Sequence, residues 1–543
     1  MSPALSLDGR MLAFIRGQNT FFGPGEVWVK LLPDGDAVQL THDGSTKMSP
    51  KFSPDGSSIA YTVGIGGGAE LTFETWTVPV LGGAPRKLLA NAEGLTWIPA
   101  AAGGQRRVLF SELTGNDAQM SIVTSTESRS NARTIYLPPP NGMAHRSFLS
   151  PDGKRILIVE METAWLPCRV IPFEGASAWG SGTVVGPSPA QCTDGAWSPD
   201  GQWVYLTANT GNGFHTWRQR VAGGKPEQVT FGVTEEEGVD VAPDGKSFVT
   251  AIGTSQSTVW VHDARGDRQV TSEGYGFQPW ISPDGTKVYY LVRTPSTTSF
   301  FAGELWVADL VSGQRQRLLP DFQLRHYTIS ADGRRVAFVA PDDKGAAPAW
   351  IAPLNGSAPP RRLAGGDCWF AFFGAAGDVI VQANEKGELV LYRVAENGGV
   401  PERLAAEIFA FGPSPDGRWI VGQSSKAWGA LFAVSPDGSG ETIICTSCSP
   451  PQGTDPQPPT LRWSPDAGTA FLTLPDATFA IPLKGGQTLP PAPKGGLKTK
   501  KDVAALPGAK LIADAPVYAG PAPSTYAFTK IASQRNIYRV RIR

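Results

Sequence analysis

Apolar residues along the chain come in short runs of β-branched and aromatic side chains, each bounded by glycine, proline, serine or aspartate. Residues 155–160 read Arg-Ile-Leu-Ile-Val-Glu, and residues 287–292 read Lys-Val-Tyr-Tyr-Leu-Val. No segment shows a sustained helical period with caps at its ends. The pattern therefore predicts an all-β chain of many short strands joined by tight turns.

A four-residue signature, Ser-Pro-Asp-Gly, precedes such apolar runs along the whole chain. Its aspartates, with degenerate copies included, are Asp8, Asp55, Asp152, Asp200, Asp244, Asp284, Asp332, Asp416 and Asp466. Successive copies lie roughly 40 to 50 residues apart, and each of the two wider gaps contains a degraded copy, at residues 96–113 and 368–384. This period is typical of the four-stranded blades of β-propellers.

Each repeat reads as four strands: one leading into the signature, one leaving it, a third rich in aromatic residues and a short fourth. The third strands predict about twelve antiparallel blades, which favours two six-bladed propellers in tandem. We expect the first β-propeller at residues 1–272 and the second at residues 273–543. Seven plus five blades, or closure across the termini, are the alternatives. The last third strand, at residues 536–542, has no fourth strand after it, so the N-terminus or a partner chain is expected to cover its edge.

The signature itself has the composition of a turn. Proline presets φ for the first central position, aspartate bonds nearby backbone amides, and glycine accepts positive φ. A calcium loop would need further acidic residues around the aspartate, and the copies lack them. We therefore interpret the signature as a structural turn between the first and second strands of each blade.

Composition narrows the class of protein. The 543 residues are 41% hydrophobic and 18% charged, with a formal net charge of -1. This composition is that of a folded chain, and its charge balance argues against nucleic acid as the default partner, because a basic face is the usual sign of phosphate binding. No apolar run reaches the ~20 residues of a membrane span. The first residues show no charged segment followed by an apolar one, so no signal peptide is expected in this chain.

The cysteines are odd in number, and their spacing leaves several roles open. Cys445 and Cys448 form a lone Cys-x-x-Cys, which is weak support for zinc and better explained by a local disulfide or two free thiols. Cys168 and Cys192 fall in adjacent blades and are candidates for a pair, provided that their Cα atoms approach within ~7 Å.

The repeats resemble the TolB-type, WD40-like propeller repeat over nearly the whole chain. Residues 142–274, with "GMAHRSFLSPDGK", "GAWSPDGQWVY" and "PEQVTFGVTEEEG", also resemble the extracytoplasmic propeller region of acidobacterial receptor-like serine/threonine kinases. That resemblance implies an extracytoplasmic sensor. The kinase motifs themselves are absent, as is the Gly-x-Ser-x-Gly elbow of α/β-hydrolases, which excludes both activities for this chain.

Candidate site residues come from aligning the entrances to the first strands, since these strands surround the central channel. Residues five or six positions before the signature proline, together with the loops between second and third strands, bring polar side chains to one mouth of the first propeller. Those side chains are His145, Arg146, Glu160, Asp194, His215, Glu236 and Glu237. Two histidines and several carboxylates at one mouth suit a divalent metal or a polar ligand.

Two functions follow from this arrangement. The first is a binding or sensor module that takes a small ligand or a protein partner at a channel mouth. The alternative is a metal-dependent hydrolase of esters, phosphoesters, sulfate esters or lactones, with zinc, manganese or calcium in the first channel. Glu160 or Glu236 would then be the general base and Arg146 an anion clamp. The metal ligands would be His145, Asp194, His215 and Glu237.

Overall fold

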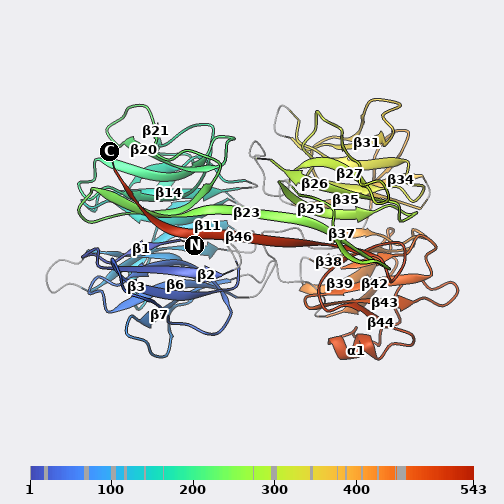
Figure 1. Ribbon diagram of the computed structural model, residues 1–543, viewed down its shortest axis with the longest axis horizontal. Helices are drawn as coiled ribbons and strands as arrows, with labels where there is room; N and C mark the ends of the chain where they lie inside the picture. Colours follow the sequence, from blue (N-terminus) through green and yellow to red (C-terminus); the bar gives the residue numbers. More distant parts are fainter. Residues whose placement is uncertain are drawn as a thin grey trace. The chain divides into compact units, whose positions relative to one another are not determined.

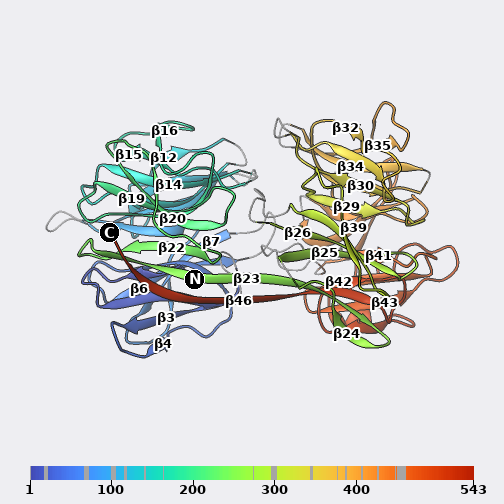
Figure 2. The ribbon, with the colours of Figure 1, turned by 45° about the horizontal axis from the view of Figure 1, so that its top comes forward.

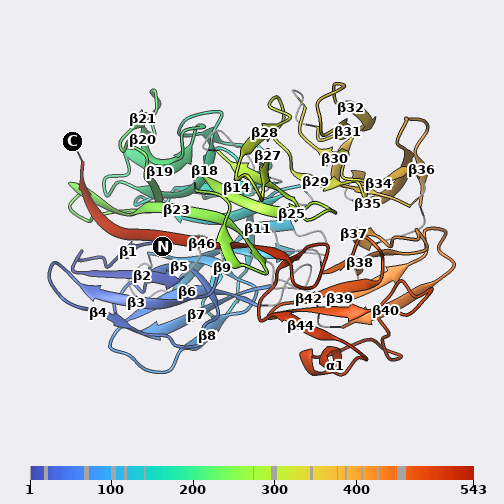
Figure 3. The same ribbon diagram turned by 45° about the vertical axis from the view of Figure 1, so that its right-hand side comes forward.

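The computed structural model describes the chain in segments, and strands account for nearly all of its regular structure (Figure 1). The described residues are 2–17, 23–65, 72–99, 105–114, 119–139, 142–162, 164–272, 274–294, 302–342, 346–375, 377–385, 388–404, 408–424, 427–446, 448 and 460–542. Within them one short helix is present, α1 at Lys500–Ala504, whose first turn is capped by Thr499 (Figure 3). The predicted all-β class is confirmed.

The chain divides into two compact units, Met1–Ser255 with Ala532–Arg543, and Gln256–Ile531. The sequence suggested a boundary after Ser272, whereas the structure changes unit after Ser255. The last twelve or so residues return to the first unit, so both chain ends lie in that unit (Figure 2).

Mainly antiparallel sheets of four strands in sequence order repeat along the first unit, and two neighbouring blades are joined into one larger sheet by a parallel pair. Their strands are β1 (Ala4–Leu5), β2 (Met11–Gly17), β3 (Gly25–Leu31), β4 (Ala37–Gln39); β5 (Thr46–Phe52), β6 (Ser58–Ile65), β7 (Thr72–Pro79), β8 (Arg86–Leu89); β9 (Glu93–Ile98), β10 (Arg107–Thr114), β11 (Gln119–Thr126), β12 (Arg133–Leu137); β13 (Met143–Leu149), β14 (Arg155–Met161), β15 (Arg169–Pro172), β16 (Ser177–Ala178), β17 (Thr183–Val184); β18 (Gln191–Trp197), β19 (Trp203–Asn209), β20 (Phe214–Arg220), β21 (Glu227–Gln228); and β22 (Glu235–Val241).

The innermost strands of this unit form a closed ring. β1, β5, β9, β13, β18 and β22 contact one another in succession, and β22 also contacts β1. The backbone amide of Leu5 on β1 donates to the Asp240 carboxylate on β22 at 2.7 Å. First strands therefore surround the centre of the unit, as the alignment of strand entrances assumed.

Two long strands each run from one unit into the other: β23 (Ser247–Asp263) and β46 (Tyr526–Arg541), drawn green and red in Figure 1. In the first unit the start of β23 pairs with both β22 and the end of β46, where the Ile542 amide donates to the Lys246 carbonyl at 2.9 Å. The strand at residues 536–542 is thus the third strand of the last sheet of the first unit. It comes from the far end of the chain.

The second unit repeats the same sheet order. Its strands are β24 (Gly266–Gln269); β25 (Tyr275–Ile281), β26 (Lys287–Arg293), β27 (Glu304–Asp309), β28 (Arg315–Leu318); β29 (His326–Ile329), β30 (Arg335–Val339), β31 (Ala349–Pro353), β32 (Arg361–Ala364); β33 (Asp367–Phe373), β34 (Asp378–Glu385), β35 (Glu388–Ala395), β36 (Glu402–Arg403); β37 (Ile408–Pro413), β38 (Ile420–Ser424), β39 (Ala427–Val434), β40 (Glu441–Cys445); β41 (Leu461–Trp463), β42 (Thr469–Leu474), β43 (Ala477–Pro482), β44 (Lys510–Ala513); and β45 (Tyr518–Ala519). The rest of β46 pairs with β45 and with the rest of β23, and β24 completes that sheet.

The core lies between successive sheets, because the faces of neighbouring blades pack on one another. Ala13 and Val27 of one sheet, for example, pack with Ile59 and Tyr61 of the next. Strands within the blades are deeply buried, and on the second strand β14 five successive residues are buried. The fold is a β-propeller. No helix in the described segments is long and apolar enough to cross a membrane.

Candidate functional site

The innermost strands of the first unit carry a β-bulge where the candidate residues lie. The register with the second strand shifts between Ala144 and Arg146 on β13, between Cys192 and Asp194 on β18, and between Glu237 and Asp240 on β22. A bulge interrupts the strict alternation of side chains and re-aims those beside it. Neighbouring candidate residues therefore reach different partners.

His145 contacts a carboxylate on the preceding blade. Its Nδ1 lies 3.1 Å from Oε2 of Glu93 on β9, and both side chains are buried. The Trp165 ring packs on the imidazole with centroids 5.3 Å apart. Glu93 was not among the predicted residues, because it begins the first strand of a degraded repeat that has no signature from which to count.

Arg146 turns the other way and forms a buried ion pair with Asp194 on β18. The guanidinium Nη1 donates to Oδ2 at 2.9 Å, and the Gly195 amide donates to the other oxygen at 2.8 Å. Burial raises the pKa of Asp194, and so does the charge of Asp240, while Arg146 opposes the shift. The predicted anion clamp and one predicted metal ligand are thus bound to each other.

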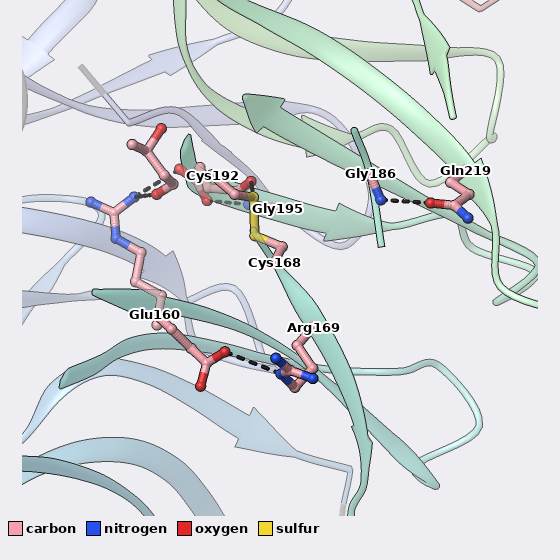
Figure 4. The surroundings of a disulfide bond; sticks show 10 residues. Glu160, Cys168, Arg169, Gly186, Cys192, Gly195 and Gln219 are labelled. Carbon is pink, nitrogen blue, oxygen red and sulfur yellow. Dashed lines mark hydrogen bonds and ion pairs between the residues drawn. A yellow bond between two sulfur atoms is a disulfide. The ribbon is translucent and has the colours of Figure 1, made fainter. Parts of the chain in front are cut away.

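Glu160 is buried at the end of β14. It contacts one residue of its own blade and one of the preceding blade. The Tyr136 hydroxyl donates to Oε1, and the Arg169 Nε lies 3.3 Å from Oε2 (Figure 4). Burial raises the pKa of Glu160, although both contacts oppose that shift. Neither partner belongs to the signature, so the sequence alignment could not identify them.

His215 and Glu236 form a second buried histidine–carboxylate pair. The Nδ1 of His215 lies 3.0 Å from Oε2 of Glu236, which also accepts from the Thr230 hydroxyl at 2.8 Å. The Nε2 of the same ring lies 3.3 Å from the Asn212 carbonyl. Burial raises the pKa of Glu236, and the contacts with Thr230 and His215 lower it.

Glu237 meets a residue from the far end of the chain. Its Oε2 lies 3.8 Å from Nε of Arg535 on β46, and the same guanidinium lies 3.7 Å from the Glu235 carboxylate. The sequence could not connect these residues, because only the return of β46 brings Arg535 to β22. The predicted site residues therefore lie in separate pairs: His145 with Glu93, Arg146 with Asp194, His215 with Glu236, and Glu237 with Arg535.

No group of three or more His, Cys, Asp or Glu side chains with the geometry to hold a metal occurs in the described part of the chain. Each of the two histidines instead directs its Nδ1 at a carboxylate, an arrangement that also orients imidazoles bound to metals. The assignment of zinc, manganese or calcium to His145, Asp194, His215 and Glu237 stays a prediction.

Both cysteine pairs that the sequence suggested are disulfides. Cys168 and Cys192 are joined with Cα atoms 5.5 Å apart, and Figure 4 shows this bond near Glu160 and Arg169. Cys445 and Cys448 are joined in the second unit. The remaining thiol, Cys368, is buried, and burial raises its pKa to about 11.

Comparison with known proteins gives distant likenesses. No family model matches the chain. Dipeptidyl-peptidase 5 of Porphyromonas gingivalis is 24% identical over 384 residues, covering 66% of this chain and 53% of that protein. The chain thus spans about half the length of this curated relative. The resemblance to receptor-like kinases stays an expectation from the motifs.

Among solved structures, similar chains include TolB proteins and a peptidase. A TolB protein from Agrobacterium tumefaciens is 16% identical, with a TM-score of 0.36 over 52% of this chain and 99% of that one. TolB from Acinetobacter baumannii is 14% identical, with a TM-score of 0.30 over 57% and 64%. A puromycin-hydrolyzing peptidase of Mycobacterium tuberculosis is 16% identical, with a TM-score of 0.28 over 66% and 60%. Scores this low carry no functional argument, so function must be argued from the site.

Proposed function

We propose that this chain is a binding or sensor module whose first propeller unit takes a small polar ligand or a protein partner at a channel mouth. One observation carries the proposal: every predicted acid, base or anion clamp is already bound by a counter-group of the same unit. Glu160 accepts from Tyr136 and approaches Arg169, and Arg146 is paired with Asp194. Such pairs build a rigid, polar centre.

Catalysis would place stronger demands on these groups. A general base must be within hydrogen-bond reach of the proton that it removes, with an oxygen directed at the substrate. Each oxygen of Glu160 faces a donor of the protein, and Glu236 shares Oε2 between His215 and Thr230. Half-buried Lys51 and Asp240, on innermost strands and near enough for their charges to act on Asp194, add to the charge of this centre.

Two disulfides support an extracytoplasmic location, which we propose on this ground. Disulfides persist in oxidising compartments and are rare in the cytosol of most organisms. Both bonds involve buried sulfur atoms, with Cys168, Cys192, Cys445 and Cys448 at most 2% exposed. Burial of this kind is expected for structural disulfides, because it limits access to reductants.

A second candidate function, a metal-dependent hydrolase, is favoured by one observation only. The two Nδ1–carboxylate contacts, to Glu93 and Glu236, would orient His145 and His215 as metal ligands do. The substrate would then be an ester, phosphoester, sulfate ester or lactone. Zinc, manganese or calcium would supply the activated water when bound.

Metal content and turnover separate the two functions. The purified full-length chain is analysed for zinc, manganese and calcium by mass spectrometry, and hydrolysis of p-nitrophenyl acetate and bis-p-nitrophenyl phosphate is measured. The binding module predicts neither stoichiometric metal nor turnover. Stoichiometric metal with turnover, both lost in a folded His145→Ala protein, would contradict it. Arg106→Ala is the matched control, because Arg106 is half-exposed and pairs with Asp55 in the same unit.

A further inference from the structure

The centre of the second unit contains an arginine that has no carboxylate partner among the described residues. Arg462 lies on β41, an innermost strand, and its Nη1 donates to the Ala519 carbonyl on β45 at 3.0 Å. The guanidinium carbon lies 3.7 Å from the ring centroid of Trp280 on β25. The guanidinium thus contacts residues of two further first strands, β45 and β25.

Two enclosed arginines of the first unit are paired with carboxylates. Arg146 is paired with Asp194, and Arg535 lies within ion-pair distance of Glu235 and Glu237. An enclosed cation without a counter-charge is costly, and proteins normally pair it. Burial lowers the pKa of Arg462 to about 10, which reflects the same cost and still leaves the side chain charged at neutral pH.

The surroundings of Arg462 are aromatic. Tyr327 on β29 donates its hydroxyl to the Gln278 carbonyl and is therefore not a free donor. Tyr518 on β45, next to the Ala519 whose carbonyl accepts from Arg462, also interacts electrostatically with the guanidinium. A planar cation over the face of Trp280 keeps N–H groups that can bind an anion, and the aromatic rings of Trp280, Tyr327 and Tyr518 favour an apolar body on that anion.

We propose that Arg462 and Trp280 form a binding site for a small aromatic carboxylate at the centre of the second unit. The carboxylate would accept two parallel hydrogen bonds from the guanidinium fork, and its ring would contact the aromatic side chains. Arg462 as a whole residue is only partly buried. This site lies in the second unit, whereas the proposed function concerns the first unit. Either proposal can therefore be wrong without affecting the other.

Calorimetric titration of the full-length chain with benzoate tests the proposal, with benzamide as the neutral probe of the same shape. Benzoate is expected to bind, and benzamide about tenfold more weakly or not at all, because it offers no charge to the guanidinium. Absence of benzoate binding, or equal binding of the two probes, would overturn the proposal.

Variants then assign the site. Arg462→Met should weaken benzoate binding by about tenfold or more without lowering the thermal midpoint, since it removes an uncompensated charge and keeps the apolar stem. Arg393→Met is the matched control, because Arg393 already pairs with Asp378 and Glu402, and its benzoate affinity should equal that of the wild type.

A milder pair of variants covers the case in which Arg462→Met does not fold. Arg462→Lys keeps the charge and loses the planar fork, and Trp280→Phe keeps an aromatic face of smaller size; each should weaken benzoate several-fold. Unchanged benzoate affinity in both folded proteins contradicts the assignment of the site to these residues.

Discussion

The serine hydroxyl in each Ser-Pro-Asp-Gly turn makes two hydrogen bonds. In the second repeat Ser53 Oγ donates to the Asp55 carboxylate at 2.6 Å and accepts from the Ser58 amide at 3.0 Å. Donation from this hydroxyl is the largest cause that lowers the pKa of Asp55. The signature therefore closes its turn through the serine as well as through the proline, aspartate and glycine.

One copy of the turn lacks this hydroxyl and gives a matched test. Ala242 stands where the serine would be, and the Lys246 amide still donates to Asp244 at 3.0 Å. Ser53→Ala should cost about 1–2 kcal/mol of unfolding free energy, and Ala242→Ser should add about 0.5–1 kcal/mol. Denaturant unfolding measures both. Destabilisation by Ala242→Ser would show that this turn cannot accommodate the bond.

Buried Glu160 should make the stability of the first unit depend on pH. Its folded pKa is raised by burial, so it binds a proton more tightly when folded than when unfolded. Its contribution to stability is fully present below its ordinary pKa of 4.5 and is lost as pH rises through the folded pKa.

Glu160→Gln removes this titration. The thermal midpoint of the variant relative to wild type should rise between about pH 4.5 and pH 7, because only the wild type then has to bury a charge. Calorimetry across this range measures the difference. A midpoint difference that does not change with pH would contradict the raised pKa. Glu227→Gln is the control, because Glu227 is half-exposed and pairs with Arg218.

At the scale of elements, the end of β46 closes the ring of the first unit. Ile537 packs with Leu5, Leu12, Ala242 and Val249, which come from both ends of that ring. Two arginines of β46, Arg535 and Arg539, contact acidic side chains and place positive charge along the edge of the strand. Charged side chains on an edge discourage pairing with another chain.

The same strand supplies a matched pair of substitutions. Ile537→Ala should destabilise the first unit by about 1–2 kcal/mol, because it removes a partly buried side chain packed between the first and last sheets. Ile531→Ala, at a position 42% exposed on the same strand, should change the unfolding free energy by less than about 0.5 kcal/mol. Equal effects in denaturant unfolding would contradict closure through β46.

At the scale of the whole molecule, two units of the same design have different centres. In the first, charged pairs such as Arg146 with Asp194 lie on the innermost strands. In the second, the aligned position is His326, whose pKa burial lowers to about 3 and whose ring meets Phe370 and Phe372 edge to face. A shared scaffold thus carries one polar and one aromatic centre, so the two units are suited to different ligands.

Each unit also has its own disulfide, which allows the two to be destabilised separately. Cys168 and Cys192 are 24 residues apart, whereas Cys445 and Cys448 are 3 apart. Loop-closure entropy then predicts a loss of about 3 kcal/mol for Cys168→Ser with Cys192→Ser, and roughly half of that for Cys445→Ser with Cys448→Ser. Calorimetry should show the first loss in the transition of the first unit alone. A shift of both transitions together would show that the units unfold as one.

Much of the fold was predictable because its signals are local. The turn of Ser53 and Asp55, the apolar runs around it and the repeat period are all read from neighbouring residues. Their places in adjacent repeats made Cys168 and Cys192 candidates for a pair, and the structure joins them. The partners of the candidate site were not predictable in this way. Glu93 lies in a degraded repeat, and Tyr136 and Arg169 lie on strands that the signature does not mark.

The sequence by itself determined the strands, the turns and the β-propeller class, since hydrophobic period and turn chemistry act over a few residues. Only the tertiary structure decided which charges meet and how the first ring closes. Arg535 reaches Glu237 across some 300 residues, and β46 completes a sheet begun by β22, because burial of a strand edge depends on space and not on sequence distance. Tertiary packing likewise decides that Arg146 contacts the carboxylate of Asp194, whereas Arg462 contacts the aromatic face of Trp280.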